Sequence, residues 1–161
     1  MTEAERIVDQ LKRALDGPAW HGPSINEILS DVDAELAAAV PMEGVHTIWE
    51  ILLHVIVWIR IGRMRVDGEQ TPKNLDPKQD WPSVENSSNE AWKHAILELR
   101  EEHKLLVKRV SLLHDSDLTK IFPGTEYTYY FLLHGIIQHN LYHAGQMSLI
   151  KSSLLKRTIR P

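Results

Sequence analysis

The chain has 161 residues, 43% of them hydrophobic, which is the size and composition of a single domain (1–161) with a core of ordinary size. Its lack of cysteine excludes disulfides, thiolate metal sites and a cysteine nucleophile, so histidine and carboxylate remain as metal ligands. The formal net charge of −4, without a cluster of basic residues, argues against a nucleic-acid partner, because phosphate binding requires such clusters.

Helices are the regular elements that the sequence pattern predicts. No segment alternates strictly between apolar and polar residues, as a half-buried strand would. We therefore expect an all-α chain, with long helices over about Glu3–Asp16, Val45–Val66, Asn89–His114 and Glu126–Leu155. Between the first two, Pro23 and Ser24 begin a short helical piece, and Asp33 caps another that reaches Val40.

The segment 67–88, between the second and third long helices, is rich in Pro, Asp, Asn and Ser. Such a segment reaches roughly 70 Å when extended, whereas a helix of about 25 residues is only about 38 Å long. It could therefore cross the full length of the molecule and leave these two helices parallel. We expect a four-helix bundle with up-down-down-up order and a long crossover, with simple up-and-down order as the alternative.

The last long helix has apolar residues on two opposite sides. One side carries Tyr130, Leu133, Ile137, Leu141 and Ala144, and the other carries Leu132, Ile136, Met147 and Ile150. Either this helix is central or one side meets a second subunit, and we expect a homodimer. Gly145 in the same helix costs about 1 kcal/mol relative to alanine, which indicates that another helix approaches closely there.

No segment has the length and composition of a membrane span. The longest apolar run, Ile51–Ile59, is interrupted by His54 and followed by Arg60, far short of the roughly 20 residues that cross a bilayer. The sequence begins MTEAERIVDQ, which is polar and acidic rather than basic and then apolar, unlike a secretion signal. We therefore expect a cytoplasmic protein without a membrane partner.

Two histidines of the last helix form the strongest candidate for a metal site. In HNLYHAGQ, His139 and His143 are four residues apart, so a helix places them on one face with Cβ atoms about 5 to 6 Å apart. This spacing suits two imidazoles that bind one cation. Gln146, one turn further on the same face, could orient a ligand or a metal-bound water.

The third ligand must come from another helix, and His54 is the best candidate. It is the lone polar residue in ILLHVIVWI, and an unpaired buried imidazole costs roughly 1 to 3 kcal/mol. Glu50, one turn earlier on the same face, could orient His54, act as a fourth ligand or be the general base, which is the catalytic role that we assign to it. The alternative for each histidine is an ordinary hydrogen-bonded core residue.

Three further residues are candidates for the surroundings of the site. His103 lies on the apolar face of the third long helix, where it either faces the site or is a satisfied core histidine. His46 could rim the pocket or simply begin the second long helix. Trp81 could fold over the site together with the 67–88 segment. His134 projects away from the histidine pair of the last helix, and we exclude it.

Four stretches of the sequence carry a family resemblance: AWHGPSINEIL from Ala19, GVHTIWEILLHVIVW from Gly44, DWPSV from Asp80 and HGIIQHNLYHAGQMSLI from His134. They look like the DinB/YfiT superfamily, particularly its DinB-like branch, over almost the whole chain and in the right order. The resemblance implies a four-helix bundle, commonly dimeric, with one divalent ion on three histidines. These fall on His54, His139 and His143; nickel or zinc is the first expectation, with iron, manganese or copper as alternatives.

The resemblance also bears on the reaction. Members with an assigned activity are similar to thiol S-transferases that conjugate low-molecular-weight thiols such as bacillithiol, or to thiol-dependent isomerases. Three neutral imidazoles leave a divalent ion an open position, as in catalytic sites. We expect a small-molecule substrate and, first, a metal-dependent transferase that uses a low-molecular-weight thiol. The alternatives are a metal-dependent hydrolase and a non-catalytic, stress-related binding module whose metal fastens two helices.

Overall fold

The computed structural model describes residues 1–158, so residues 159–161 of the expected domain lie outside the described part. Every regular element in residues 1–158 is a helix, which confirms the all-α prediction. The helices are α1 (Glu3–Asp16), α2 (Ile25–Leu29), α3 (Ala34–Ala38), α4 (Ile48–Val66), α5 (Pro77–Asp80), α6 (Asn89–Val110), α7 (Asp115–Leu118) and α8 (Tyr129–Thr158).

Short polar side chains set where several helices begin. Before α4, Thr47 Oγ1 accepts a hydrogen bond from Glu50 N at 3.1 Å, and Glu50 Oε2 accepts one from Thr47 N at 2.8 Å. Because this capping box fixes the first turn, α4 begins later than Val45, and the predicted start was wrong. Asp33 caps α3, as predicted, and Ser24 caps α2, which begins at Ile25.

Other helix limits differ from the prediction. α6 ends at Val110 rather than His114, and α8 begins at Tyr129 rather than Glu126. An isolated bridge between Ile121 and the residue that precedes α8 holds the chain in a turn up to that point. The short helices α5 and α7 were not predicted, because four residues are too few to show a helical period.

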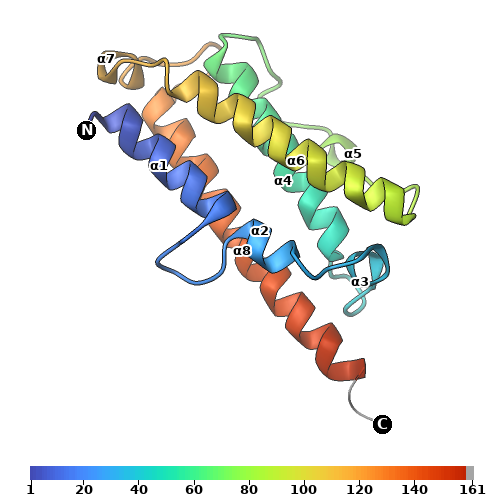
Figure 1. Cartoon of the computed structure of the whole chain (residues 1–161). Helices are drawn as coiled ribbons and strands as arrows, with labels where there is room; N and C mark the ends of the chain where they lie inside the picture. The colour runs from blue at the N-terminus through green and yellow to red at the C-terminus, as the bar shows by residue number, and fades with distance from the viewer. Residues whose placement is uncertain (159–161) are drawn as a thin grey trace.

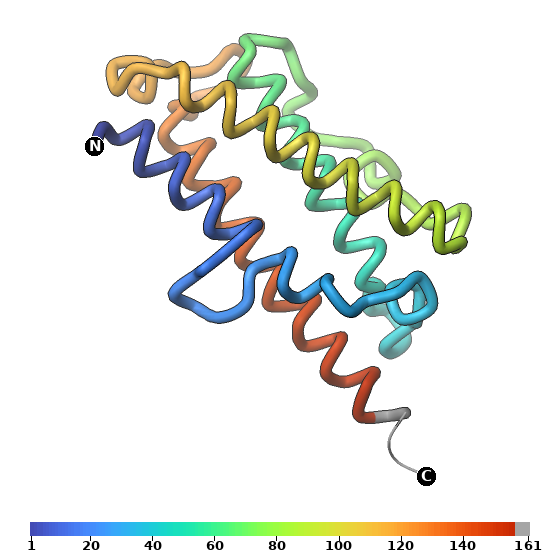
Figure 2. Tube along the Cα trace, viewed as in Figure 1, coloured from blue at the N-terminus to red at the C-terminus, as the bar shows by residue number. Residues whose placement is uncertain are grey.

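The four long helices α1, α4, α6 and α8 pack along one another (Figure 1). α4 packs against α6 and α8, and α1 packs against α8 and α6. In Figure 1, α4 and α6 run in one direction, whereas α1 and α8 run in the other. Figure 2 shows the 67–88 segment returning along the molecule from the end of α4 to the start of α6. On this path the segment contacts α4 through α5.

Aromatic packing fixes how α4 is rotated against α6. Trp49 and Trp92 are buried and meet edge to face, with ring centroids 5.0 Å apart. Trp92 Nε1 donates a hydrogen bond to the Val32 carbonyl at 2.8 Å, so the indole loses no hydrogen bond on burial. With this face of α4 turned towards α6, another face of α4 is free to meet α8.

Both apolar sides of α8 are largely buried within the chain. Leu133 and Met147 are fully buried, and the other apolar residues of both sides, apart from Tyr130 and Leu141, are nearly so. α8 contacts α1, α2, α4 and α7. The two-sided pattern therefore needs no second subunit to explain it. None of the helices within residues 1–158 combines the length and hydropathy of a membrane span.

The close approach between helices occurs at Gly62 of α4. A Cβ added there would lie 2.2 Å from Ile136 Cδ1 of α8. Nothing lies within 4 Å of a Cβ added at Gly145, so the interpretation of that glycine was wrong. This contact draws α4 and α8 together about two turns after His54 in α4 and, at Ile136, about one turn before His139 in α8.

Candidate metal centre

His54 lies in the middle of α4, on the side that faces α8. Its side chain is buried, and its Nδ1 lies 2.7 Å from the backbone carbonyl oxygen of Asp80 and 3.2 Å from Asp80 Oδ1. Both oxygens accept hydrogen bonds, so Nδ1 is assigned the proton and Nε2 keeps its lone pair. The 67–88 segment thus satisfies one nitrogen of the buried imidazole and leaves the other for the site.

His143 is oriented in the same way from within α8. Its Nδ1 lies 2.6 Å from Gln146 Oε1, which accepts the proton of that nitrogen. Nε2 of His143 is therefore also unprotonated. Gln146 orients His143 through this bond, one of the two roles considered for it from the sequence.

The Nε2 atoms of three histidines lie close together. His139 Nε2 lies 3.0 Å from His54 Nε2 and 3.1 Å from His143 Nε2. One ring nitrogen from each histidine lies within 4.8 Å of the other two. Two imidazole nitrogens that bind one ion at about 2.1 Å lie roughly 3.0 to 3.4 Å apart at right to tetrahedral angles. The three histidines therefore fit a divalent metal ion.

Electrostatics favour the same conclusion. Lone pairs that face one another repel, and a single proton on His139 Nε2 can be donated to only one of its two neighbours. Burial, followed by the neighbouring His143 and His54, lowers the pKa of His139 to about 3. Burial is also the main cause that lowers the pKa of His143. Both imidazoles are neutral at pH 7, which is the form that binds a metal.

Trp81 covers the site from the 67–88 segment. Its ring stacks on His54, with centroids 3.9 Å apart, and His46 stacks on its other face at 3.8 Å. Both pairs are close to parallel, with interplanar angles of 6° and 5°. Trp81 thus lies directly against His54, and His46 lies on the far side of the Trp81 ring from His54.

Two other predicted residues are engaged elsewhere. Glu50 Oε2 binds Thr47 N in the capping box and lies 3.5 Å from His46 Nδ1. Its role as general base stays a prediction. His103 Nε2 donates to the Leu11 carbonyl at 2.9 Å, so His103 joins α6 to α1 as a satisfied core histidine and does not face the site.

A family comparison covers most of the chain. The family model described as the DinB superfamily matches residues 20–147, a range that contains the three histidines. The chain belongs to the DinB superfamily. The match confirms the resemblance seen in the sequence. Neither a curated protein nor a solved structure matches the chain.

Two clefts of this DinB-superfamily protein border the histidines. The larger, of about 610 Å³, reaches His143 and is mainly apolar. Its walls include Met42, Val45, Ile51, Trp81, Gln146, Leu149 and Ile150. The smaller, of about 330 Å³, reaches His139 and Trp58. A small molecule could therefore approach the site from either cleft.

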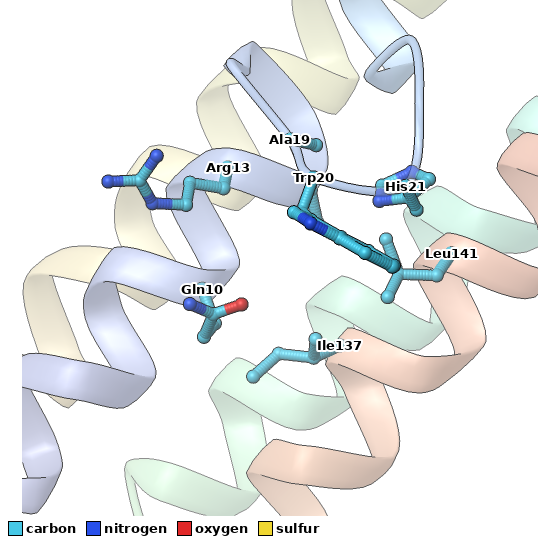
Figure 3. Close-up of a pocket in the computed structure, with 8 residues that line it drawn as sticks. Gln10, Arg13, Ala19, Trp20, His21, Ile137 and Leu141 are labelled. Carbon is cyan, nitrogen blue, oxygen red and sulfur yellow. The ribbon is translucent and has the colours of Figure 1, made fainter.

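Another cavity lies away from the histidines. It measures about 400 Å³ and lies between α1, α8 and the loop that carries Trp20 (Figure 3). Trp20 projects over it towards Leu141, and Gln10 and Ile137 line it as well. Because none of the three histidines lines this cavity, we do not connect it with the metal site.

Asp80 and Trp58 are site residues that the sequence analysis missed. Asp80 Oδ1 accepts a hydrogen bond from Trp58 Nε1 at 2.8 Å, while its carbonyl oxygen accepts one from His54. Asp80 therefore ties the 67–88 segment to α4 at two points. A signal was present, because Asp80 directly precedes Trp81, which was expected over the site.

Replacing Gln146 with leucine should weaken metal binding by about 10- to 100-fold, because His143 Nδ1 loses the acceptor that fixes its tautomer and ring angle. A zinc titration in competition with a chromophoric chelator measures this change. Gln138→Leu, at an exposed position of the same helix, is the matched control and should bind zinc as the wild type does. An affinity of Gln146→Leu within twofold of the wild type would contradict the assignment.

Proposed function

We propose that this DinB-superfamily protein is a metal-dependent enzyme that transfers a low-molecular-weight thiol to a small electrophilic substrate. One observation carries the proposal: the Nε2 atoms of three histidines lie close together, and two of them are left unprotonated by tautomers that Asp80 and Gln146 fix. Closed structural sites surround an ion with four protein ligands, whereas three leave a position for substrate. Nickel or zinc is the expected ion, with iron, manganese or copper as alternatives.

The chemistry of a transfer suits the residues present. A divalent ion at this site would hold an incoming thiol as the thiolate at neutral pH. The sulfur then forms a bond to the electrophilic carbon, the leaving group departs with its bonding electrons, and the thiol proton passes to solvent. The chain has no cysteine, so the thiol is a second small molecule. The two clefts beside the histidines offer room for two reactants.

The contacts of Glu50 favour transfer over hydrolysis. A hydrolase of this type uses a general base to activate water, and Glu50 was the candidate. Its carboxylate is held by Thr47 N and Thr47 Oγ1, while the Asp80 carboxylate is held by Trp58 and His54. A thiol held as its thiolate at a divalent ion would be a nucleophile without such a base. Glu50 and a hydrolytic reaction remain the second candidate.

The finer features of fold and assembly belong to the same proposal. The helix directions in Figure 1 support an up-down-down-up four-helix bundle with the 67–88 segment as its crossover. Tyr142 and Leu149, on the exposed side of α8, are 66% and 74% exposed and could form the interface of a homodimer. We propose a cytoplasmic location, where low-molecular-weight thiols are kept reduced.

Thiol conjugation in the presence of defined metals tests this function. The zinc and nickel forms should conjugate monochlorobimane with bacillithiol, glutathione or cysteine at least about tenfold faster than the uncatalysed reaction. His143→Ala should lose this acceleration, because the ion loses a ligand. Acceleration of ester hydrolysis without thiol conjugation would favour the hydrolase. If neither reaction is accelerated while metal removal destabilises the fold, the metal is a structural fastener.

A further inference from the structure

The smaller cleft beside the histidines has two cationic groups and an aromatic wall. It is lined by the aromatic residues Trp58, Phe122, Tyr127 and Phe131, and by Arg65 and Lys73. His139 lies at the same cleft. A pocket of this composition accepts an apolar chain that carries a negative charge.

Arg65 differs from the other arginines of α4. Arg60 Nε and Arg63 Nε each bind the Glu102 carboxylate, at 2.8 Å and 3.0 Å. Arg65 is 9% exposed, yet within residues 1–158 no carboxylate lies at ion-pair distance from it. A buried charge is costly unless it is paired, so the guanidinium has the properties of an anion-binding group.

The hydrogen bonds of Arg65 leave part of its guanidinium available. Nε donates to Thr71 Oγ1 at 2.8 Å and Nη2 donates to the Pro72 carbonyl at 3.2 Å. Among the described residues, Nη1 has no partner, although a guanidinium has five N–H donors in a planar fork. The two contacts hold the group in place, and the remaining donors match the oxygens of a carboxylate.

The guanidinium and the histidines are joined by one aromatic side chain. The Arg65 Cζ atom lies 5.9 Å from the centroid of Trp58, and the Trp58 ring lies 5.9 Å from the His139 ring. Phe122 borders the guanidinium on another side, with its centroid 5.3 Å from Cζ. Arg65 and His139 both line this cleft. A short molecule can therefore contact Arg65 and the metal site together.

We propose that this cleft binds the carboxylate of a small substrate on Arg65, with Lys73 at its edge, and presents the other end of the substrate at the three histidines. The inference rests on the proposed transferase and names the class of one reactant: a carboxylic acid with a short apolar chain. Lys73 is exposed and contributes less, because solvent screens its charge.

Two matched ligand pairs test the proposal on the cobalt-loaded protein. Calorimetry compares hexanoate with hexanol, which differ in charge and need no thiol chemistry. For the second pair, mercaptohexanoate and mercaptohexanol, titrations followed at the absorption band of sulfur bound to cobalt give the affinity of each thiol. The wild type should bind each carboxylate roughly 10- to 100-fold more tightly than the matched alcohol, the range of a charge-assisted hydrogen bond in a partly buried pocket.

Variants assign the preference to its residues. Arg65→Met should abolish the preference for the carboxylate and leave the affinity for the alcohol unchanged. Arg60→Met removes an arginine of the same helix that is already paired with Glu102, and this variant should keep the preference for the carboxylate. Lys73→Met should reduce it about two- to threefold, whereas Lys78→Met, at another exposed lysine of the 67–88 segment, should not. The lysine pair keeps the test valid even if Arg65→Met does not fold.

The outcomes separate this inference from the proposed function. Equal affinity of the wild type for hexanoate and hexanol would overturn the inference, as would a preference that survives Arg65→Met. If Arg65→Met does not fold, a preference unchanged in Lys73→Met would overturn it. A hexanoate preference without a sulfur–cobalt band would support the anion pocket and argue against the thiol transferase. A sulfur–cobalt band of equal strength for both thiols, without a preference for hexanoate, would support the binding of thiol by the metal and argue against the anion pocket.

Discussion

His143→Ala should lower the metal content of the purified protein from about one ion per chain to less than about a tenth of that value. The substitution removes one of three ligands and leaves His54 and His139 with an ion that two imidazoles bind weakly. The loss of affinity should exceed the roughly 100-fold upper range for residues that only orient a ligand. Elemental analysis of protein prepared without a nickel column measures the metal content. His54→Ala and His139→Ala should behave in the same way.

Two other histidines serve as controls for this measurement. His94 is exposed on α6, and His94→Ala should retain the metal content and stability of the wild type. His103→Ala removes a buried histidine that binds the Leu11 carbonyl, so it should lower the stability but not the metal content. A metal content that stays unchanged in His143→Ala, or that falls in His94→Ala, would refute the assignment of the ligands.

Removal of the metal should lower the melting temperature by about 10 °C. An ion present at about 1,000 times its dissociation constant stabilises the folded state by about 4 kcal/mol, and for a chain of this size each kcal/mol shifts the melting temperature by about 2 to 4 °C. The ion also joins α4 to α8 through His54, His139 and His143. Thermal melts with and without a chelator measure the shift, and equal melting temperatures would contradict it.

The metal-free form should also lose stability in acid. His139 has a folded-state pKa of about 3, below its unfolded value of 6.5, so the unfolded chain binds the proton more readily. The free energy of unfolding is therefore unaffected by His139 above pH 6.5. It falls as the pH drops from 6.5 towards 3, because the unfolded chain binds a proton that the folded chain does not. Melts of the metal-free wild type and of His139→Ala over this range should show a weaker pH dependence in the variant. The same slope in both proteins would argue against a depressed pKa for His139.

The long helices could be predicted from the sequence because their apolar residues recur at helical spacing over many turns. The start of α4 was misplaced although its signal was present, since Thr47 and Glu50 form the spacing of a capping box. Placing the close helix contact required the tertiary structure. A glycine allows such a contact but does not require one, which is why Gly145 was chosen and Gly62 was overlooked.

Part of the candidate site could likewise be predicted from the sequence, and part required the tertiary structure. His139 and His143 could be paired from their spacing, and His54 stood out as a polar residue in an apolar run. The partner of His54 could not be found in this manner, because Asp80 lies 26 residues away and reaches it by a fold of the 67–88 segment. For Glu50, the role of general base stays a prediction. Its position one turn from His54 suggested catalysis, whereas helix capping accounts for its carboxylate contacts.

X-ray absorption spectroscopy at the edge of the copurified metal tests the central claim most directly. The spectrum should show one ion with three imidazole nitrogens at about 2.0 to 2.1 Å for zinc, together with a lighter atom from solvent or substrate. His143→Ala, reloaded with the same metal, should show one imidazole fewer. A spectrum of the wild type with fewer than three imidazoles, or one that is unchanged in the variant, would contradict the account.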